Sequence, residues 1–189
     1  ITFLASENCI VNLGAKLDFV DINKHDYTID IDKLEKKLKK NNKIKALIAV
    51  DYAGHPCNWK ALRKLADKYK FKLINDNCHA LGAKYYNDSK YAIKYADIVT
   101  HSYHPVKSIT TGEGGAILCK DKKIYKKILS IRSHSMVKDE PNKKPWQYKI
   151  YEAGFNYRIS DIQCALGISQ LKKLTKFIEK RRKIANFYK

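Results

Sequence analysis

Three short apolar runs, each followed at once by polar residues and separated by helix-like segments, constrain the fold of this chain more than any other feature. They lie at residues 44–50, 71–76 and 96–100. Nearly continuous apolar runs of this length are typical of parallel strands that are covered on both faces. Because strand and helix alternate at the lengths of right-handed crossover units, we predict an α/β fold with a mostly parallel, doubly wound sheet.

The helices carry recognisable end signals. Asp30 precedes a segment with acidic residues in its first turn and lysines in its last, which suits the helix dipole. Ser160 precedes another helix, with an apolar face that predicts tight packing and with Gly167 inside it, which predicts close approach of a second helix. We also predict a short helix that stops at Gly14, a strand at 16–21, helices at 59–69 and 122–131, a strand at 115–119 that runs away from the site, and an exposed polar loop at 137–151.

Polar residues follow two of the predicted strands at the point where each strand ends. Asp76 closes one run, and the next leads into a loop that contains Lys107. Open α/β sheets bind ligands at the carboxyl edge of their strands. A lysine held there among apolar and hydroxyl neighbours loses its proton more easily than a surface lysine, so Lys107 is a candidate Schiff-base nucleophile. A carboxylate at the position of Asp76 needs a cation or several donors, unless it caps a helix.

Three motifs together resemble a known family. They are Ser-x-x-x-x-Lys at 102–107 with Thr-Thr-Gly-Glu-Gly-Gly at 110–115, Asp-x-x-His-Ala-Leu-Gly at 76–82, and the segment 154–167. All three are similar to motifs of the pyridoxal-phosphate sugar aminotransferases of the DegT/DnrJ/EryC1/StrS family. The resemblance implies the large domain of a fold-type I enzyme, incomplete at both ends. It implies a cofactor-binding large domain at 1–171, with its amino-terminal part missing, and a linker helix at 172–189 toward a missing small domain.

The resemblance also implies roles for individual residues. Lys107 would hold pyridoxal 5'-phosphate as a Schiff base and then move the substrate proton, while Asp76 would keep the ring nitrogen protonated. The other implied cofactor contacts are His79 at the phenolic oxygen, Ser102 at the phosphate, Phe3 stacked on the ring unless it is an ordinary core residue, and Asn156 at the phosphate of the partner subunit in a homodimer. The implied substrate contacts are Tyr52, His104 and Arg158.

Further segments resemble one subgroup of the family. Asp-Tyr-Ala-Gly at 51–54, His104, and Arg-Ser-His-Ser-Met at 132–136 are similar to enzymes that aminate C4 of a UDP-linked 4-keto-6-deoxy-N-acetylhexosamine, as in pseudaminic acid synthesis. This implies ping-pong transamination of a nucleotide sugar, with glutamate as the usual amino donor. Some family members carry histidine in place of the lysine and dehydrate their substrate, so Lys107 favours aminotransfer. A catalytically inactive homologue is the alternative, and the intact Lys107 and Asp76 oppose it.

The formal net charge of +19 would be consistent with binding to nucleic acid or to an anionic membrane. However, only five of the 38 basic residues are arginines, and the lysines are scattered over the predicted helices. This pattern favours solvated faces over a basic nucleic-acid-binding module, which heparin or DNA binding at physiological salt would reveal. No apolar run approaches the ~20 residues of a membrane helix. We therefore predict neither nucleic acid nor membrane as a partner.

The cysteines and histidines argue against two further classes of protein, a disulfide-stabilised one and a metal hydrolase. The five cysteines are scattered without a C-x-x-C pair, which fits buried thiols in a reducing cytoplasm better than a disulfide framework. His101 and His104, or Cys78 and His79, lack the spacing and carboxylate company of a zinc site. We therefore expect a cytoplasmic protein without a catalytic metal rather than a metal hydrolase.

Overall fold

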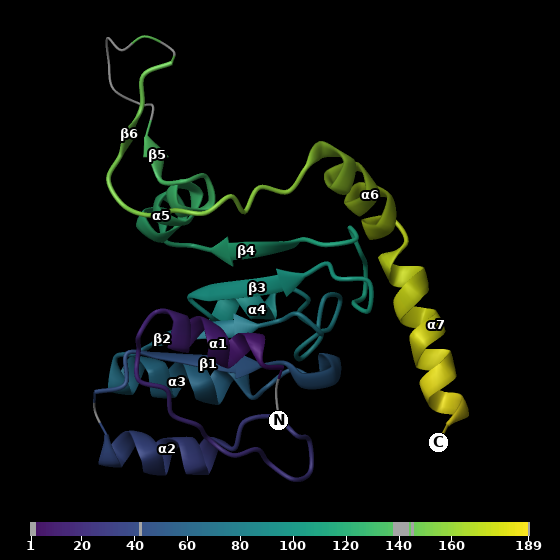
Figure 1. Cartoon of the computed structure of the whole chain (residues 1–189). Helices are drawn as coiled ribbons and strands as arrows, with labels where there is room; N and C mark the ends of the chain where they lie inside the picture. Colours follow the sequence, from purple (N-terminus) through teal and green to yellow (C-terminus); the bar gives the residue numbers. More distant parts are fainter. Residues whose placement is uncertain (1–2, 42, 138–143, 145, 189) are drawn as a thin grey trace.

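A four-stranded sheet forms the centre of the computed structural model, which describes residues 3–41, 43–137, 144 and 146–188. Its strands are β1 (Ala46–Val50), β2 (Lys72–Asp76), β3 (Ile98–Ser102) and β4 (Gly115–Cys119), in that spatial order (Figure 1). The first three strands pair in parallel, and β4 pairs antiparallel with β3. The predicted mostly parallel α/β sheet is confirmed, and so is the final strand that runs away from the site.

Helices lie against both faces of this sheet. Side chains alternate along a strand, so Leu73 and Asn75 of β2 share one face and Ile74 and Asp76 share the other. On the first face both residues are fully buried among the helices α2 (Ile31–Lys40), α3 (Trp59–Tyr69) and α4 (Tyr91–Tyr95). On the second face Asp76 accepts a hydrogen bond from α1 (Ala5–Asn12). This arrangement is the layering expected of a doubly wound fold.

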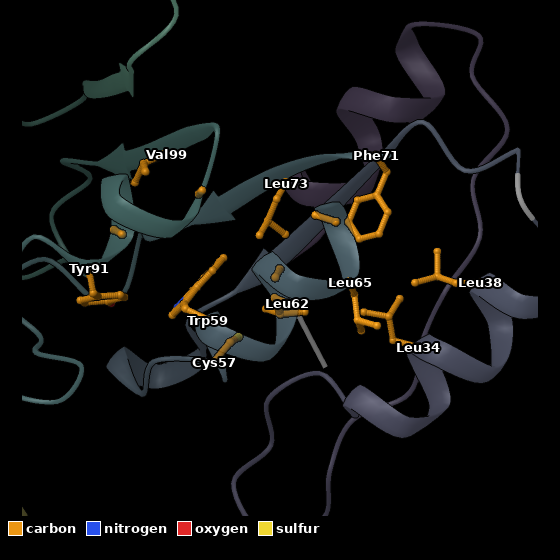
Figure 2. Packing of buried hydrophobic residues seen from close by; sticks show 14 residues of the cluster. Leu34, Leu38, Cys57, Trp59, Leu62, Leu65, Phe71, Leu73, Tyr91 and Val99 are labelled. Atoms are coloured by element: carbon orange, nitrogen blue, oxygen red, sulfur yellow. The ribbon is translucent and has the colours of Figure 1, made fainter. Parts of the chain in front are cut away.

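The hydrophobic core lies between the sheet and α3 (Figure 2). Trp59 and Leu62 of α3, Leu73 of β2 and Val99 of β3 are each 0% exposed. Burial of a large apolar side chain contributes about 1.5–3 kcal/mol relative to an exposed position, so these side chains fix the three parallel strands under the helix. The loops that leave the carboxyl ends of the strands are thereby held at one edge.

Local capping explains where several helices begin. The Asp30 side chain accepts hydrogen bonds of 3.0 Å from the amides of Asp32 and Lys33 at the start of α2. Ser160 and Gln163 form a reciprocal capping box at the start of α6 (Asp161–Leu171). Both predicted caps are confirmed, as are the predicted helices that correspond to α3 and α5 (Lys122–Arg132).

The predicted strand at 16–21 is wrong. The chain there has no strand, and the nearest ladder contact is an isolated bridge between Ile22 and Ile29. The physical reason is local, because Asp18 and Asp21 each accept a 2.8 Å hydrogen bond from the next backbone amide. Such side-chain bonds compete with the pairing of a β-ladder.

The predicted polar loop at 137–151 is partly wrong. Its two ends pair as the antiparallel strands β5 (Met136–Val137) and β6 (Lys149–Ile150), which project from the body beside α5 (Figure 1). Residues 138–143 and 145 of this predicted loop lie outside the described residues. Two-residue strands are too short to show the periodicity by which strands are found in a sequence.

The apolar face of α6 does not pack as predicted within this chain. Ile162 is 85% exposed and Ile168 is 60% exposed. Gly167 does approach a neighbour closely, but the neighbour is Thr111 of the Lys107 loop rather than a helix. Helix α7 (Leu174–Phe187) then follows, and both helices stand beside the end of the sheet where β3 finishes (Figure 1). Within the ranges that the structure describes, no helix has the length and apolar character needed to cross a membrane.

Candidate active site

Asp76 is the last residue of β2, where the parallel register pairs it with Val50 on one side and Thr100 on the other. One carboxylate oxygen, Oδ2, accepts a 2.5 Å hydrogen bond from the Ser6 hydroxyl. The other, Oδ1, accepts a 3.2 Å hydrogen bond from the Cys78 amide. A turn rather than a helix follows, so the alternative that Asp76 caps a helix is wrong. The half-buried carboxylate instead stands at the middle of the carboxyl edge.

Lys107 lies in the loop that leaves β3, and it is half-buried. Its amide donates a 3.0 Å hydrogen bond to the carbonyl of His104, and its own carbonyl accepts a 2.8 Å bond from Arg181. Two 2.9 Å backbone hydrogen bonds close the loop. The Thr111 amide donates to the Tyr103 carbonyl, and the Tyr103 amide donates to the Gly114 carbonyl. The loop is therefore a compact turn that has little freedom to move its lysine.

The charges of Asp76 and Lys107 act on the same two side chains. Burial lowers the pKa of His79, the positive charge of Lys107 lowers it further, and Asp76 opposes both. Burial likewise raises the pKa of Cys78 to about 12, with Asp76 adding to this effect and Lys107 opposing it. The parallel register sets the end of β2 beside β3, so Asp76 and the loop that carries Lys107 lie at the same edge of the sheet. The structure thus brings three of the predicted site residues to one edge of the sheet.

Tyr52 belongs to the same cluster. Its ring centroid lies 6.2 Å from that of His79, and the amide of Ala53 donates a 3.4 Å hydrogen bond to His79 Nδ1. Gly54 has a φ of +86°, and a Cβ atom there would stand 3.1 Å from the carbonyl oxygen of His79. The loop after β1 therefore packs directly on the loop after β2, and glycine permits this approach.

Ser102 and His104 shape the start of the Lys107 loop. The Ser102 hydroxyl accepts a 3.3 Å hydrogen bond from the His104 amide, and His104 Nδ1 accepts a 3.4 Å bond from the Val106 amide. His104 Nε2 lies 3.9 Å from the Glu113 carboxylate. Both side chains thus stabilise the turn and lie within a few residues of Lys107.

Phe3, Asn156 and Arg158 lie apart from this cluster in the contacts that the structure records. Phe3 is 71% exposed, so the alternative that it is a core residue is wrong. Asn156 and Arg158 are exposed, and Asn156 forms an isolated β-bridge with Ser133. Within the described part of the chain, no recorded contact joins any of the three to Lys107 or Asp76.

Sequence reasoning missed the most densely bonded carboxylate of the site region, Asp51. It is fully buried at the end of β1 and accepts five hydrogen bonds of 2.7–3.2 Å. Burial raises its pKa, and these bonds oppose the rise. The available signal was an aspartate directly after an apolar run, with asparagines at both sides of Asp76. Its donors are the Cys57 amide and the side chains of Trp59, Asn75, Asn77 and Tyr91.

Ser6 and Arg181 were missed as well, because each acts on a residue at least 70 positions away in sequence. No local pattern reports such a contact. For metal chemistry, the residues that the structure describes contain no group of three or more His, Cys, Asp or Glu side chains arranged to hold an ion.

Comparison with known proteins identifies relatives of this chain. The UDP-4-amino-4,6-dideoxy-N-acetyl-beta-L-altrosamine transaminase of Campylobacter jejuni subsp. jejuni serotype O:2 is 46% identical over 189 residues, which are 100% of this chain and 48% of that relative. GDP-perosamine synthase of Escherichia coli O157:H7 is 34% identical over 189 residues, which are 100% of this chain and 49% of that protein. The chain therefore spans about half the length of these relatives.

Solved structures agree with the sequence relatives. Helicobacter pylori PseC, an aminotransferase involved in the biosynthesis of pseudoaminic acid, superposes with a TM-score of 0.91 at 36% identity, over 100% of this chain and 48% of that one. The PLP-form of Spr1654 from Streptococcus pneumoniae superposes with a TM-score of 0.87 at 26% identity, over 99% of this chain and 50% of that one. Residues 1–189 all match one family description. The chain belongs to the DegT/DnrJ/EryC1/StrS aminotransferase family.

Proposed function

We propose that the full-length protein is a pyridoxal-phosphate-dependent aminotransferase that acts on a nucleotide-linked 4-keto-6-deoxy sugar. One observation carries the proposal: Asp76 ends β2 and pairs with Thr100 of β3, and the loop that leaves β3 carries Lys107, so a carboxylate and an amine lie at the carboxyl edge of a parallel sheet. This pair is what the chemistry needs, because transamination requires a nucleophilic amine and a fixed negative charge on opposite sides of a pyridine ring.

The donor set around Asp76 suits pyridoxal 5'-phosphate. The Ser6 hydroxyl and the Cys78 amide hold both carboxylate oxygens in place, so the negative charge has a fixed position. A carboxylate held in this way pairs best with a cation, such as a protonated ring nitrogen. When bound, the cofactor supplies an electron sink for the bond-breaking at the substrate carbon.

Lys107 performs the proton chemistry in this proposal. The compact turn from Tyr103 to Thr111 holds the Lys107 backbone at the edge of the sheet where Asp76 ends β2. The Lys107 amine would take a proton from the substrate carbon as a general base and return it as a general acid. Ser102 binds the phosphate, and His79 holds the phenolic oxygen, with its lowered pKa keeping the imidazole neutral.

The remaining predicted residues complete the site from the periphery. Phe3, which is exposed just before α1, stacks on the cofactor ring. Tyr52 and His104 flank His79 and Lys107 and contact the sugar. Arg158 binds a negatively charged part of the substrate, for which its guanidinium is suited.

A second copy of the chain brings Asn156 to the cofactor phosphate. The bare apolar face of α6, with Ile162 85% exposed, supports a homodimer because burial of such a face is favourable. We assign residues 1–171 to the cofactor-binding large domain and residues 172–189 to a linker toward a small domain. Helix α7 covers most of that linker.

The relatives support the substrate class. The altrosamine transaminase at 46% identity supports a UDP-linked N-acetylhexosamine with a keto group at C4. Our proposal includes glutamate as the amino donor, as the family resemblance of the motifs implies. The product would serve the biosynthesis of a glycan, by analogy with H. pylori PseC, which takes part in the biosynthesis of pseudoaminic acid. The cysteines of the described residues are free thiols, which supports the reducing cytoplasm as the compartment.

Absorbance spectroscopy tests the proposal directly. Full-length protein mixed with pyridoxal 5'-phosphate should turn yellow and lose the colour on borohydride reduction, and peptide mapping should find the label on Lys107. The Lys107→His variant should stay colourless, whereas Lys84→His, an exposed lysine outside the loop, should behave as the unaltered protein. A label on another lysine, or none, would overturn the proposed function.

A further inference from the structure

Helix α7 contacts both loops of the proposed site. At the Lys107 loop, a guanidinium nitrogen of Arg181 donates a 2.8 Å hydrogen bond to the Lys107 carbonyl oxygen. At the loop after β2, a Cβ atom on Gly82 would stand 2.3 Å from Ile178 Cδ1 and 3.6 Å from Leu174 Cδ2. One helix therefore touches the two segments that carry the amine and the carboxylate, although Arg181 lies 74 residues beyond Lys107.

The contact between α7 and the Lys107 loop is loose apart from the Arg181 bond. A cavity of about 290 Å³ lies between them, and it is lined by residues of both elements. Phe177 and Arg181 contribute from the helix, and Pro105, Ser108 and Thr110 contribute from the loop. Where packing leaves such a space, a charge-assisted hydrogen bond carries more of the positional restraint.

The hydrogen bond from Arg181 restrains the backbone of Lys107, because its acceptor is the Lys107 carbonyl oxygen. Lys107 has its amide bound to His104 and its carbonyl bound to Arg181, so both peptide groups that flank its Cα are fixed. With the backbone fixed, the direction of the Cα–Cβ bond is fixed, and the amine sweeps a smaller volume. Pre-organisation of this kind lowers the entropic cost of placing a reacting group.

We propose that Arg181 is a positioning residue that holds the backbone of Lys107, and that α7 thereby sets where the Lys107 amine stands. The amine's role as the reacting group rests on the proposed function, whereas the restraint on the backbone does not. Gln163 of α6 acts at the far end of the same loop, because its Nε2 donates a 2.8 Å hydrogen bond to the Glu113 carbonyl. Arg181 is the contact that reaches the lysine itself.

Hydrogen–deuterium exchange of the full-length protein without cofactor tests the restraint. Arg181→Met keeps the apolar stem and removes the donors, and it should accelerate exchange of peptide 103–112 by about tenfold. Arg181→Lys, which keeps one cationic donor, should restore exchange to within about threefold of the unaltered protein. Arg182→Met is the matched control, because Arg182 is an exposed neighbour on the same helix, and it should change nothing.

Cofactor titration gives the second readout. In Arg181→Met the pH at which the visible band of the lysine-bound cofactor changes should shift relative to the unaltered protein, with Arg182→Met unshifted. Unchanged exchange in Arg181→Met, equal acceleration in the β1 peptide 46–50, or an equal effect of Arg182→Met would each overturn the proposal. Failure of borohydride to label Lys107 in the unaltered protein would refute the proposed function instead, and the exchange result would stand by itself.

Discussion

The hydroxyl of Ser6 on α1 donates a 2.5 Å hydrogen bond to Oδ2 of Asp76, the residue that ends β2. The two residues are 70 positions apart in sequence. The bond therefore ties the amino-terminal helix to the carboxyl edge of the sheet. A short bond to an ionised acceptor is among the stronger hydrogen bonds in proteins, so Ser6 contributes to the fixed position of the Asp76 charge.

Ser6→Ala should therefore lower activity. Loss of one bond to a charged group costs about 1.5–3 kcal/mol, and we expect kcat/KM to fall about tenfold or more while the fold persists. Steady-state kinetics of the full-length protein with the proposed nucleotide-sugar substrate measures the change. Asn8→Ala, an exposed position on the same helix, is the control and should retain full activity. Equal kinetics for Ser6→Ala and the unaltered protein would show that the bond has no part in holding Asp76.

Asp51 should matter for stability more than for chemistry. It satisfies five buried donors at the end of β1, so Asp51→Ala leaves the Trp59 indole and other groups without an acceptor. We expect a loss of at least about 3 kcal/mol in the free energy of unfolding, measured by urea denaturation. Asp67→Ala removes the ion pair between the exposed Asp67 carboxylate and Arg63 and should cost less than about 1 kcal/mol. Similar losses for the two variants would contradict the role of Asp51.

The parallel strands and the loops after β2 and β3 could be predicted from the sequence, because each is marked by residues within its own segment. Apolar runs report burial, and Asp30 and Ser160 report the starts of helices through their own side chains. The strand predicted at 16–21 failed because alternation alone does not provide a neighbouring strand, and the side chains of Asp18 and Asp21 bonded their own backbone instead.

The site was predicted only as far as its motifs extend. Asp76, His79 and Lys107 lie in motifs, and the structure places them around one edge. Ser6 and Arg181 support them through contacts between distant segments, which depend on the folded arrangement and leave no local pattern. Asp51 does follow an apolar run, but its contact with Asn77 depends on the fold. The apolar face of α6 was expected to pack, but the described part of the chain leaves it exposed.

Two histidines should make stability depend on pH. Burial is the main cause of the lowered pKa of both His79 and His101. Above pH 6.5 the imidazoles are neutral in the folded and unfolded states, so they add no pH dependence. Below 6.5 the unfolded chain takes up protons first, and the free energy of unfolding falls as the pH drops toward the lower folded pKa.

We expect a combined loss of about 1 kcal/mol between pH 7 and 5.5, because both groups are partly screened by solvent. Denaturation series at several pH values measure it. His101→Gln should flatten the profile, whereas His25→Gln, at an exposed position, should leave its slope intact. A slope that is the same in all three proteins would mean that other groups cause the pH dependence.

Gly115 should be intolerant of any side chain. It pairs with Ser102 at the base of the Lys107 loop, and a Cβ atom there would lie 2.4 Å from the backbone carbonyl oxygen of His101. Backbone cannot give way as a flexible side chain can, so Gly115→Ala should push β4 away from β3 and cost at least about 2 kcal/mol. Loss of the pairing should also release the loop, and activity should fall with it.

Gly112→Ala separates this clash from backbone strain. Gly112 lies in the same loop with a φ of +79°, and a Cβ atom there would meet nothing within 4 Å. Its replacement should therefore cost only about 1–2 kcal/mol for the left-handed conformation. Urea denaturation of both variants measures the difference, and amide exchange of peptide 98–102 reports the β3–β4 pairing. A larger loss for Gly112→Ala than for Gly115→Ala would mean that loop conformation, rather than strand contact, limits this part of the site.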